Sequence, residues 1–354
     1  KKQMKKIYTL LLISFFVCSF GYAKTYSNAK SDDTTKQTLT ENALFQKGEY
    51  GLNINASYIY WQPKQDGTEM GSFLNISTQT TDSRIFLDES YKSGFKIGLG
   101  YAFDYDNWDL DAGYLWFHNT NTKSKTRSVA TEFIFPYWGG MSDLTNTRAT
   151  TASASWKLLL DMGYLNLTRP FYLGKKILLS FNYGLKGGRI DQKYSANYVL
   201  ATGSLTSNWK SNSWLIGPNV GIGAKWLMGY NFFIATNAST ALFYQNFSVS
   251  SLQTATTTSA HDAISNDKTS MLNPNFEYFI GIGYSKLFSD NQYNFLIQAG
   301  YEFQTYFRQN VMRHFRDYAH IDQNAGVPIL LPSTYSGIGS LFMHGLTIKT
   351  QFDF

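Results

Sequence analysis

Apolar and polar residues alternate along much of this chain, and the alternation predicts β-strands. In residues 95–105 the odd positions are large and apolar, as at Ile97 and Leu99, while the even positions are small or polar, as at Gly98. A period of two is the spacing of side chains on one face of a strand. Each segment has about ten residues, the length of a tilted strand that crosses a bilayer. The pattern recurs in residues 50–61, 107–118, 177–188, 214–226, 230–246, 276–286 and 293–305.

The last residues, "HGLTIKTQFDF" (344–354), form another alternating segment that ends on an aromatic side chain. Chain ends are usually polar and frayed. A membrane barrel instead needs its last strand to pair with its first, because an open sheet edge is not tolerated in lipid. A terminal aromatic is also typical of the signal that the barrel-assembly machinery of outer membranes recognises. We predict that this signal consists of Leu346, Ile348, Phe352 and Phe354.

Two features favour an outer-membrane barrel over a soluble β-sandwich. Connections between the segments alternate between short and long, as short periplasmic turns and long outer loops do. Aromatic residues also stand at segment ends, as in interfacial girdles. They are Tyr58, Tyr60, Trp61, Trp108, Trp116, Trp214 and Trp226.

The connections set the predicted strand count. Long polar links are expected at 62–91, 119–147, 190–212, 248–272 and 307–337. The sequence therefore predicts an all-β, antiparallel, up-and-down transmembrane barrel of ten strands with both termini of the barrel sequence on the periplasmic side. Residues 148–170 are too long for one crossing and could hide a bulge or an extra hairpin, so twelve strands is the alternative.

The N-terminal region predicts export. Residues 1–23 combine basic residues, an apolar core and small residues, the layout of a signal peptide that is too short to span a membrane comfortably. They hold four lysines and the sole cysteine, Cys18, so removing them lowers the formal charge from +6 to +2 and leaves no disulfide. Without a basic cluster, nucleic acid is not an expected partner. Residues 24–49 read as a polar periplasmic lead-in, and residues 50–354 as the barrel.

The polar parity of the strands predicts the lining of the lumen. It is rich in glycine, including Gly98, Gly281 and Gly300, which would leave space inside a narrow barrel. Five bases and seven acids share it and form no ring of a single sign. The predicted lumen-lining residues are Lys96, Asp104, Asp109, Asp111, Lys157, Asp161, Lys186, Lys225, Glu277, Glu302, Lys349 and Asp353.

No motif predicts an enzyme, a cofactor or a metal site. Of the five histidines, His118, His261, His314 and His320 lie in or beside predicted outer loops, and His344 lies on the lipid-facing parity. No nucleophile or carboxylate is placed with them by a recognisable spacing. The apolar piece "FIFPYWGGM" (133–141) is expected to pack against other loops over the barrel mouth, to fold inward and narrow the pore, or to contact a host surface.

Three stretches carry a family resemblance. They are "ASYIYWQPKQDG" (56–67), "SWKLLLDMGYLNLTRPFYLGKKILLSFNYGLKGGRIDQKY" (155–194) and the C-terminal strand. Together they resemble the major outer membrane protein-like family of Legionella and chlamydia-like bacteria, which is described as pore-forming. The resemblance implies a porin-type barrel in the outer membrane of a Gram-negative bacterium. Some members cross-link through cysteines, and residues 24–354 have none.

These observations lead to one expected function and one alternative. The expected function is passive diffusion of small hydrophilic solutes or ions through an outer-membrane porin. The alternative is a barrel with a closed lumen that serves as a structural protein or as an adhesin with loops presented to a host. Expected partners are outer-membrane lipid and lipopolysaccharide, the barrel-assembly machinery and the solutes, and a homo-oligomer is left open.

Overall fold

The computed structural model describes residues 51–75, 80–103, 108–139, 148–173, 176–201, 203–256, 263–289, 292–321, 328–336 and 339–354. The predicted signal peptide (1–23), the predicted lead-in (24–49) and Asp104 lie outside these residues. The described residues belong to one compact unit, Lys47–Phe354. Within them, no helix is long and apolar enough to cross a membrane.

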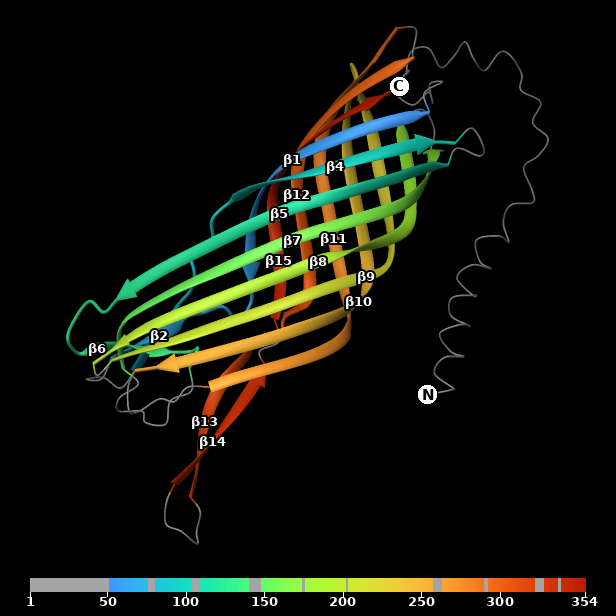
Figure 1. The fold of residues 1–354 in the computed structure, drawn as a ribbon. Helices are drawn as coiled ribbons and strands as arrows, with labels where there is room; N and C mark the ends of the chain where they lie inside the picture. The colour runs from blue at the N-terminus through green and yellow to red at the C-terminus, as the bar shows by residue number, and fades with distance from the viewer. Residues whose placement is uncertain are drawn as a thin grey trace, which may run out of the picture. The chain divides into compact units, whose positions relative to one another are not determined.

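Ten antiparallel strands form a closed ring (Figure 1). Each strand pairs with two neighbours in the order β1, β4, β5, β7, β8, β9, β10, β11, β12 and β15, and β15 returns to β1. The strands are β1 (Leu52–Gln65), β4 (Lys92–Ala102), β5 (Asp109–Thr126), β7 (Ala149–Leu173), β8 (Ile177–Leu200), β9 (Gly203–Gly229), β10 (Phe232–Ala255), β11 (Ala263–Phe288), β12 (Tyr293–Asn310) and β15 (Gly339–Asp353). The predicted fold class and the ten-strand count are confirmed.

The two ends of the barrel sequence meet at the closure of the ring. Strand β15 pairs with β1 from Asn53↔Asp353 to Gln65↔Leu341. Beyond this ladder, the backbone N–H of Leu52 donates to the carbonyl of Phe354 (3.0 Å), and the N–H of Phe354 donates to the carbonyl of Leu52 (2.9 Å). The last residue of the chain therefore completes the hydrogen bonding that a bilayer requires.

One end of the barrel has tight connections. Strands β9 and β10 are joined by Tyr230 and Asn231, both with positive φ (50° and 68°), as the central residues of a type I′ hairpin turn require. Both termini of the ring lie at this end, because β1 begins beside the end of β15. Since bacterial barrels have short periplasmic turns, this is the periplasmic end, and the other end is the outer end.

Further strands occupy connections at the outer end. Strands β2 (Gly71–Asn75) and β3 (Thr80–Ile85) lie between β1 and β4, and β6 (Glu132–Pro136) lies between β5 and β7. Strand β2 pairs with both β3 and β6. Strands β13 (Arg313–Ile321) and β14 (Pro328–Ser336) form a separate hairpin between β12 and β15.

The long polar links predicted at 190–212 and 248–272 are largely wrong, because strands occupy most of them. Strands β7 to β11 have 24 to 27 residues, whereas β1, β4 and β15 have 14, 11 and 15. A bilayer crossing needs about ten residues, so we infer that the long strands continue beyond the outer surface of the membrane. Figure 1 shows β7 to β10 extending past β1 and β4 at one end of the barrel. Residues 149–173 likewise form one continuous strand, and the twelve-strand alternative is wrong.

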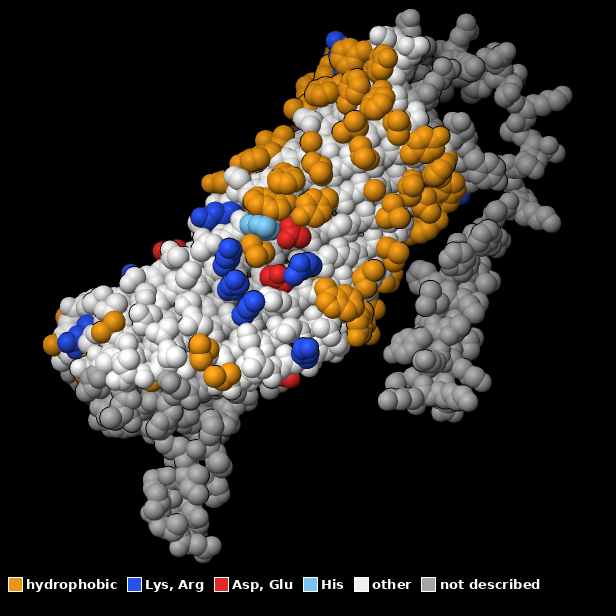
Figure 2. All heavy atoms as spheres, in the orientation of Figure 1, with side chains coloured by type: hydrophobic (Ala, Val, Ile, Leu, Met, Phe, Trp, Pro, Cys, Tyr) orange, Lys and Arg blue, Asp and Glu red, His pale blue; other side chains and the backbone are white. Residues whose placement is uncertain are grey.

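The outward face carries an apolar belt, and the facing predicted for the belt is confirmed. Leu99 and Ile280 are both exposed (61% and 46% of their surface), and Gly98 is buried. Phe352 and Phe354 also face outward. Figure 2 shows these apolar side chains gathered over one part of the barrel wall. We call them the lipid belt.

Beyond the lipid belt, toward the outer end, the two faces of the barrel wall exchange character: apolar side chains point inward and polar side chains point outward. In β7 the buried inward residues are Trp156, Leu158 and Leu160, while Lys157 is exposed on the outward face. Above the lipid the outside of the barrel meets water, so apolar side chains pack inside and polar ones lie outside. The girdle position predicted for Trp61 is wrong, because Trp61 is fully buried inside the barrel.

A charged C-terminal residue should impair assembly. We expect Phe354→Asp to lower the yield of folded protein in the outer membrane severalfold, because it removes the outward terminal aromatic and puts a charge at the lipid-facing end of the closing strand. Heat-modifiable gel mobility measures the folded fraction. The control is Tyr230→Asp, in the exposed turn at the same end of the barrel. Equal yields from Phe354→Asp and wild type would contradict the proposed signal.

Leu99→Arg should destabilise the barrel in lipid vesicles by about 2–4 kcal/mol, the cost of arginine on the lipid face near the bilayer midplane. Asn197→Arg is the matched control, because Asn197 is exposed on β8 beyond the belt. A surface change of that kind costs about 0.5 kcal/mol or less. Urea unfolding followed by tryptophan fluorescence measures both, and equal losses would show that the belt is misplaced.

Candidate functional site in the barrel lumen

A buried network around Glu302 spans part of the lumen at the level of the lipid belt. The Nζ of Lys96 (β4) lies 2.5 Å from Oε1 of Glu302 (β12), and the Glu302 carboxylate also accepts hydrogen bonds from Gln304 (2.9 Å) and Thr347 (2.8 Å). Lys96 lies over the ring of Trp61, 4.9 Å from its centroid. Because two strands, β1 and β15, separate β4 from β12, this ion pair crosses the lumen and does not run along the wall.

A second ion pair crosses the opposite part of the lumen. Lys186 (β8) pairs with Glu277 (β11), and both side chains are largely buried. Nearby, the amide of Asn219 donates to Asn166 (3.1 Å). The two ion pairs together join four strands across the barrel interior with charges of both signs.

The periplasmic end of the lumen holds the remaining predicted charges. Lys225 and Lys349 interact electrostatically with Asp111 and Asp353. Asp353 accepts hydrogen bonds from Asn294 and Gln351, each of 2.7 Å. Asp111 accepts one from Thr168 (3.3 Å). Asp109 lies on the inward parity of β5, one step closer to the periplasmic end, and interacts with Lys225.

Lys157 and Asp161 are not in the lumen, and their predicted lining role is wrong. Both project outward from β7, above the point where the facing inverts. Each carboxylate oxygen of Asp161 lies 3.2 Å from Nε2 of His118. The Asp161 carboxylate also accepts a hydrogen bond from the hydroxyl of Tyr114 (2.8 Å). The sequence spacing of 43 residues between His118 and Asp161 concealed this pair, which only the β5–β7 register brings together.

The inward glycines do not leave open space, contrary to the expectation. A Cβ at Gly283 would lie 2.2 Å from the ring of Phe233, and Cβ atoms at Gly281 and Gly300 would lie 2.7 and 2.6 Å from the ring of Phe279. Neighbouring aromatic side chains therefore lie across these glycines. Small residues next to large ones fill a narrow barrel, as layers of interior side chains do in other small barrels.

A segment that follows β1 enters the outer mouth of the barrel. Tyr194 and Tyr198 (β8) donate hydrogen bonds to the carbonyls of Thr68 (3.1 Å) and Met70 (2.6 Å). Asn310 (β12) donates to the carbonyl of Asp66 (2.8 Å). Burial raises the pKa of the Tyr194 hydroxyl and the pKa of the Tyr198 hydroxyl well above the usual value for tyrosine. Both hydroxyls therefore stay protonated and can donate these hydrogen bonds. We call residues 66–70 the mouth segment.

The apolar loop predicted at 133–141 folds inward. Trp138 is fully buried, stacks on Tyr194 (centroids 4.2 Å apart) and meets Trp209 edge-on (5.4 Å). Its indole N–H donates to the carbonyl of Glu69 in the mouth segment (2.7 Å). Trp138 therefore fastens the mouth segment to the inner wall formed by β8 and β9. Residues 140–141 lie outside the described part of the chain.

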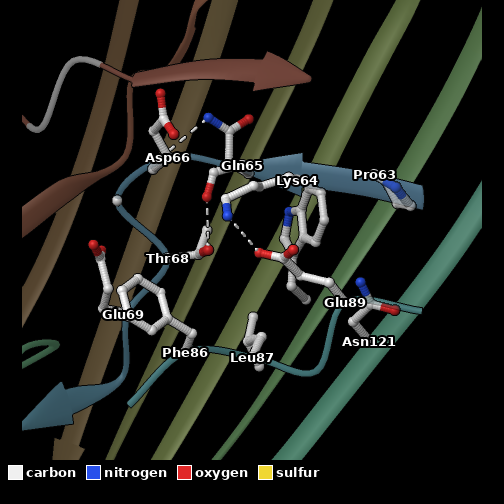
Figure 3. Close-up of a pocket in the computed structure, with 12 residues that line it drawn as sticks. Pro63, Lys64, Gln65, Asp66, Thr68, Glu69, Phe86, Leu87, Glu89 and Asn121 are labelled. Atoms are coloured by element: carbon white, nitrogen blue, oxygen red, sulfur yellow. Dashed lines mark hydrogen bonds and ion pairs between the residues drawn. The ribbon is translucent and has the colours of Figure 1, made fainter. Parts of the chain in front are cut away.

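A small cavity of about 50 Å³ borders the mouth segment (Figure 3). Its lining includes Lys64 and Glu89, which form an ion pair of 3.1 Å, together with Thr68 and Trp156. That volume holds a few water molecules and no larger solute. Among the described residues, no group of three or more histidine, cysteine, aspartate or glutamate side chains could hold a metal ion. His261 and the side chains of His314 and His320 lie outside the described parts.

A closed antiparallel ring with a lipid belt, short turns at one end and a polar lumen defines an outer-membrane β-barrel. Residues 47–352 match the sequence profile described as "Legionella pneumophila major outer membrane protein precursor". The chain therefore belongs to the Legionella major outer membrane protein family, and the resemblance seen in the sequence is confirmed. No curated protein sequence matches it.

Three solved structures show a low similarity to the chain. The protease OmpT from Escherichia coli has a TM-score of 0.39 and 8% identity, over 86% of this chain and 96% of OmpT. The translocator domain of the autotransporter NalP from Neisseria meningitidis has a TM-score of 0.30 and 11% identity, over 91% and 95%. The toluene transporter TodX from Pseudomonas putida has a TM-score of 0.27 and 8% identity, over 88% and 90%.

Breaking the buried Lys96–Glu302 pair should be costly. Lys96→Met leaves the Glu302 carboxylate buried without its cation, so we expect the free energy of unfolding to fall by about 3 kcal/mol. The double variant Lys96→Met/Glu302→Gln should recover most of this loss. Lys64→Met is the control, because the Lys64–Glu89 pair is exposed and should contribute about 1 kcal/mol or less. Urea unfolding in vesicles measures all three, and equal losses for Lys96→Met and Lys64→Met would contradict the buried network.

Proposed function

We propose that the protein is a narrow outer-membrane channel that passes ions and small hydrophilic solutes passively, with a barrier at its outer mouth. The observation that carries the proposal is the charged and amide-rich lumen at the level of the lipid belt. Burying an ion pair commonly contributes less stability than apolar packing of the same volume. The presence of two ion pairs across the barrel, where apolar packing would be more stable, therefore supports the proposal that the lumen contacts water and ions.

The arrangement of charge sets the expected selectivity. Of the predicted lumen residues that the structure describes and leaves inside the barrel, four are basic and five are acidic. They are Lys96, Lys186, Lys225 and Lys349, with Asp109, Asp111, Glu277, Glu302 and Asp353. Strong ion selectivity comes from a ring of one sign. The channel should therefore have a small conductance and at most a modest preference for cations.

The mouth segment acts as the barrier in this proposal. Tyr194, Tyr198 and Asn310 hold its backbone to the wall, and Trp138 holds Glu69. Each such hydrogen bond contributes about 1 kcal/mol net. A few of them favour the closed arrangement while leaving it reversible, so conduction is intermittent and not continuous.

A barrel with a permanently closed lumen is the second candidate, as a structural protein or as an adhesin. The hydrophobic core at the outer end favours it, because Trp138, Tyr198 and Met70 are buried within the barrel mouth. We propose no catalytic role: the polar contacts of His118 and Asp161 among the described residues include Tyr114 and no serine. The barrel-assembly machinery is proposed as the partner of the C-terminal strand.

Planar-bilayer recording of Tyr194→Phe/Tyr198→Phe tests the channel and its barrier together. Removing two hydrogen bonds, about 2 kcal/mol in total, should raise the open probability by about tenfold or more without changing the step size. The control is Tyr244→Phe, an exposed tyrosine on the outward face of β10. If folded wild type and both variants give no current steps, the channel proposal fails and the closed barrel is supported. A strongly anion-selective reversal potential would contradict the assigned lumen charges.

A further inference from the structure

Three lysines stand side by side on the outward face, beyond the lipid belt. Lys157 (β7) is the cross-strand partner of Lys193 (β8), and Lys193 is the partner of Lys210 (β9). All three are exposed. Neighbouring strands lie about 4.8 Å apart, so the three residues span about 10 Å across the sheet. We call these residues the lysine row.

The lysine row has no acidic neighbour within it. Its flanking partners are Thr120 on β5 and Ser250 on β10, both neutral. Like charges directly opposite one another on a sheet face destabilise the sheet. No ion pair joins the three lysines to any residue that the structure describes. Repulsion among the three lysines therefore lowers the stability of the isolated barrel. An anionic ligand bound to the row would offset this repulsion.

The two acids nearest to the lysine row are already occupied. Asp191 lies 3.6 Å from Arg189 and accepts the backbone N–H of Ser213 (3.2 Å). Asp161 is held by His118 and Tyr114. Each acid therefore has polar partners of its own, and neither forms an ion pair with a lysine of the row. Arg189 itself is 69% exposed, so its guanidinium stays accessible between the row and the lipid belt, although Asp191 offsets part of its charge.

The height of the row above the lipid belt identifies its ligand class. On β8 the exposed apolar series ends at Leu185, and Arg189 pairs with the exposed Trp214 of β9 at the edge of the belt. Lys193 lies four residues farther out, about 13 Å along the strand. The row is on the outer-leaflet side, beyond the level where phospholipid phosphates lie beside an aromatic girdle. Figure 2 shows basic side chains and a histidine next to the apolar belt.

We infer that the lysine row and Arg189 bind the anionic sugar headgroup of lipopolysaccharide, the phosphorylated glycolipid of the outer leaflet. Its acyl chains would lie along the belt below Trp214, and its phosphates and acidic sugars would reach the lysines. The geometry matches a ligand that carries several anionic groups on a scaffold extending outward from the acyl chains. This inference is independent of conduction, because all four residues lie outside the lumen.

Binding of fluorescently labelled lipopolysaccharide to the full chain in mixed micelles tests the inference. We expect Lys157→Ser/Lys193→Ser/Lys210→Ser to weaken the apparent affinity about tenfold or more. The control Lys64→Ser/Lys123→Ser/Lys125→Ser removes the same charge from outer-end lysines, two of which already pair with acids, Glu89 and Asp88. It should change the affinity less than twofold. The triple arginine variant of the row should bind like wild type.

Competitors separate the sources of anionic charge. Unlabelled lipopolysaccharide should compete, while inorganic phosphate and phosphatidylglycerol micelles at the same phosphate concentration should not. Equal weakening in the two triple variants, or equal competition by phosphatidylglycerol, would overturn the inference.

Stability gives a second measurement that does not depend on binding. Without lipopolysaccharide, the serine variant of the row should unfold at a urea concentration equal to or above that of wild type, because the lysine repulsion is gone. Added lipopolysaccharide should raise the midpoint of wild type more than that of the variant at the same concentration. A variant that is less stable than wild type without lipopolysaccharide, or equally stabilised with it, would contradict the role of the row.

Discussion

The pairing of every backbone N–H and carbonyl group within the bilayer is the constraint on which the rest of this structure depends. Lipid offers no hydrogen-bonding partner, so a sheet can cross the membrane only if it closes. In this chain the closure is made by β1 and β15 and is completed at Leu52 and Phe354. The backbone of Phe354 therefore takes part in the closure of the ring, and the belt, lumen and outer extension are all arranged around that ring.

The part of the fold inside the bilayer could be predicted from the sequence because lipid imposes a simple rule there. Outward residues such as Leu99 and Ile280 must be apolar, so a period of two with one apolar face marks each crossing. The ten crossings follow from that pattern and its spacing, whereas the family was indicated by the resemblance of residues 56–67, 155–194 and the C-terminal strand. The turn between β9 and β10 was misplaced by two residues, because the predicted segment 230–246 included Tyr230 and Asn231, whereas these two residues form the turn and the strand begins at Phe232.

Beyond the bilayer the same rule fails, and the errors share that cause. Lys157 and Asp161 were placed in the lumen because polar residues were taken to face inward along the whole strand. The outer half of β7 instead packs Trp156 and Leu160 inside and exposes its charges to water. Strand extensions were taken for loops because their inward faces carry polar residues such as Gln192 and Ser211, which hides the alternation. The His118–Asp161 pair depends on the register of two distant strands, which no local pattern specifies.

The lumen and the outer mouth combine two kinds of interior in one barrel. At the level of the lipid belt, charges such as those of Lys96 and Glu302 meet across the barrel and form a polar interior. At the outer end, Trp138 and Tyr198 pack around the mouth segment as in the core of a soluble protein. The barrel wall is continuous through both regions, so one sheet supports a polar lumen and an apolar closure. The outward surface changes in the opposite sense, from the lipid belt to the lysine row.

Cysteine accessibility along β7 and β8 tests the inversion of facing most directly, because Cys18 is the sole cysteine of the sequence and can be replaced first. Single cysteines at Leu185, Lys157 and Leu160 would be probed in vesicles with a lipid-attached quencher and with a water-soluble maleimide. The structure predicts that a label at 185 is quenched from the lipid, that 157 reacts rapidly with the maleimide, and that 160 responds to neither. Rapid maleimide labelling at 160 with protection at 157 would contradict the inversion and the assignment of the lumen.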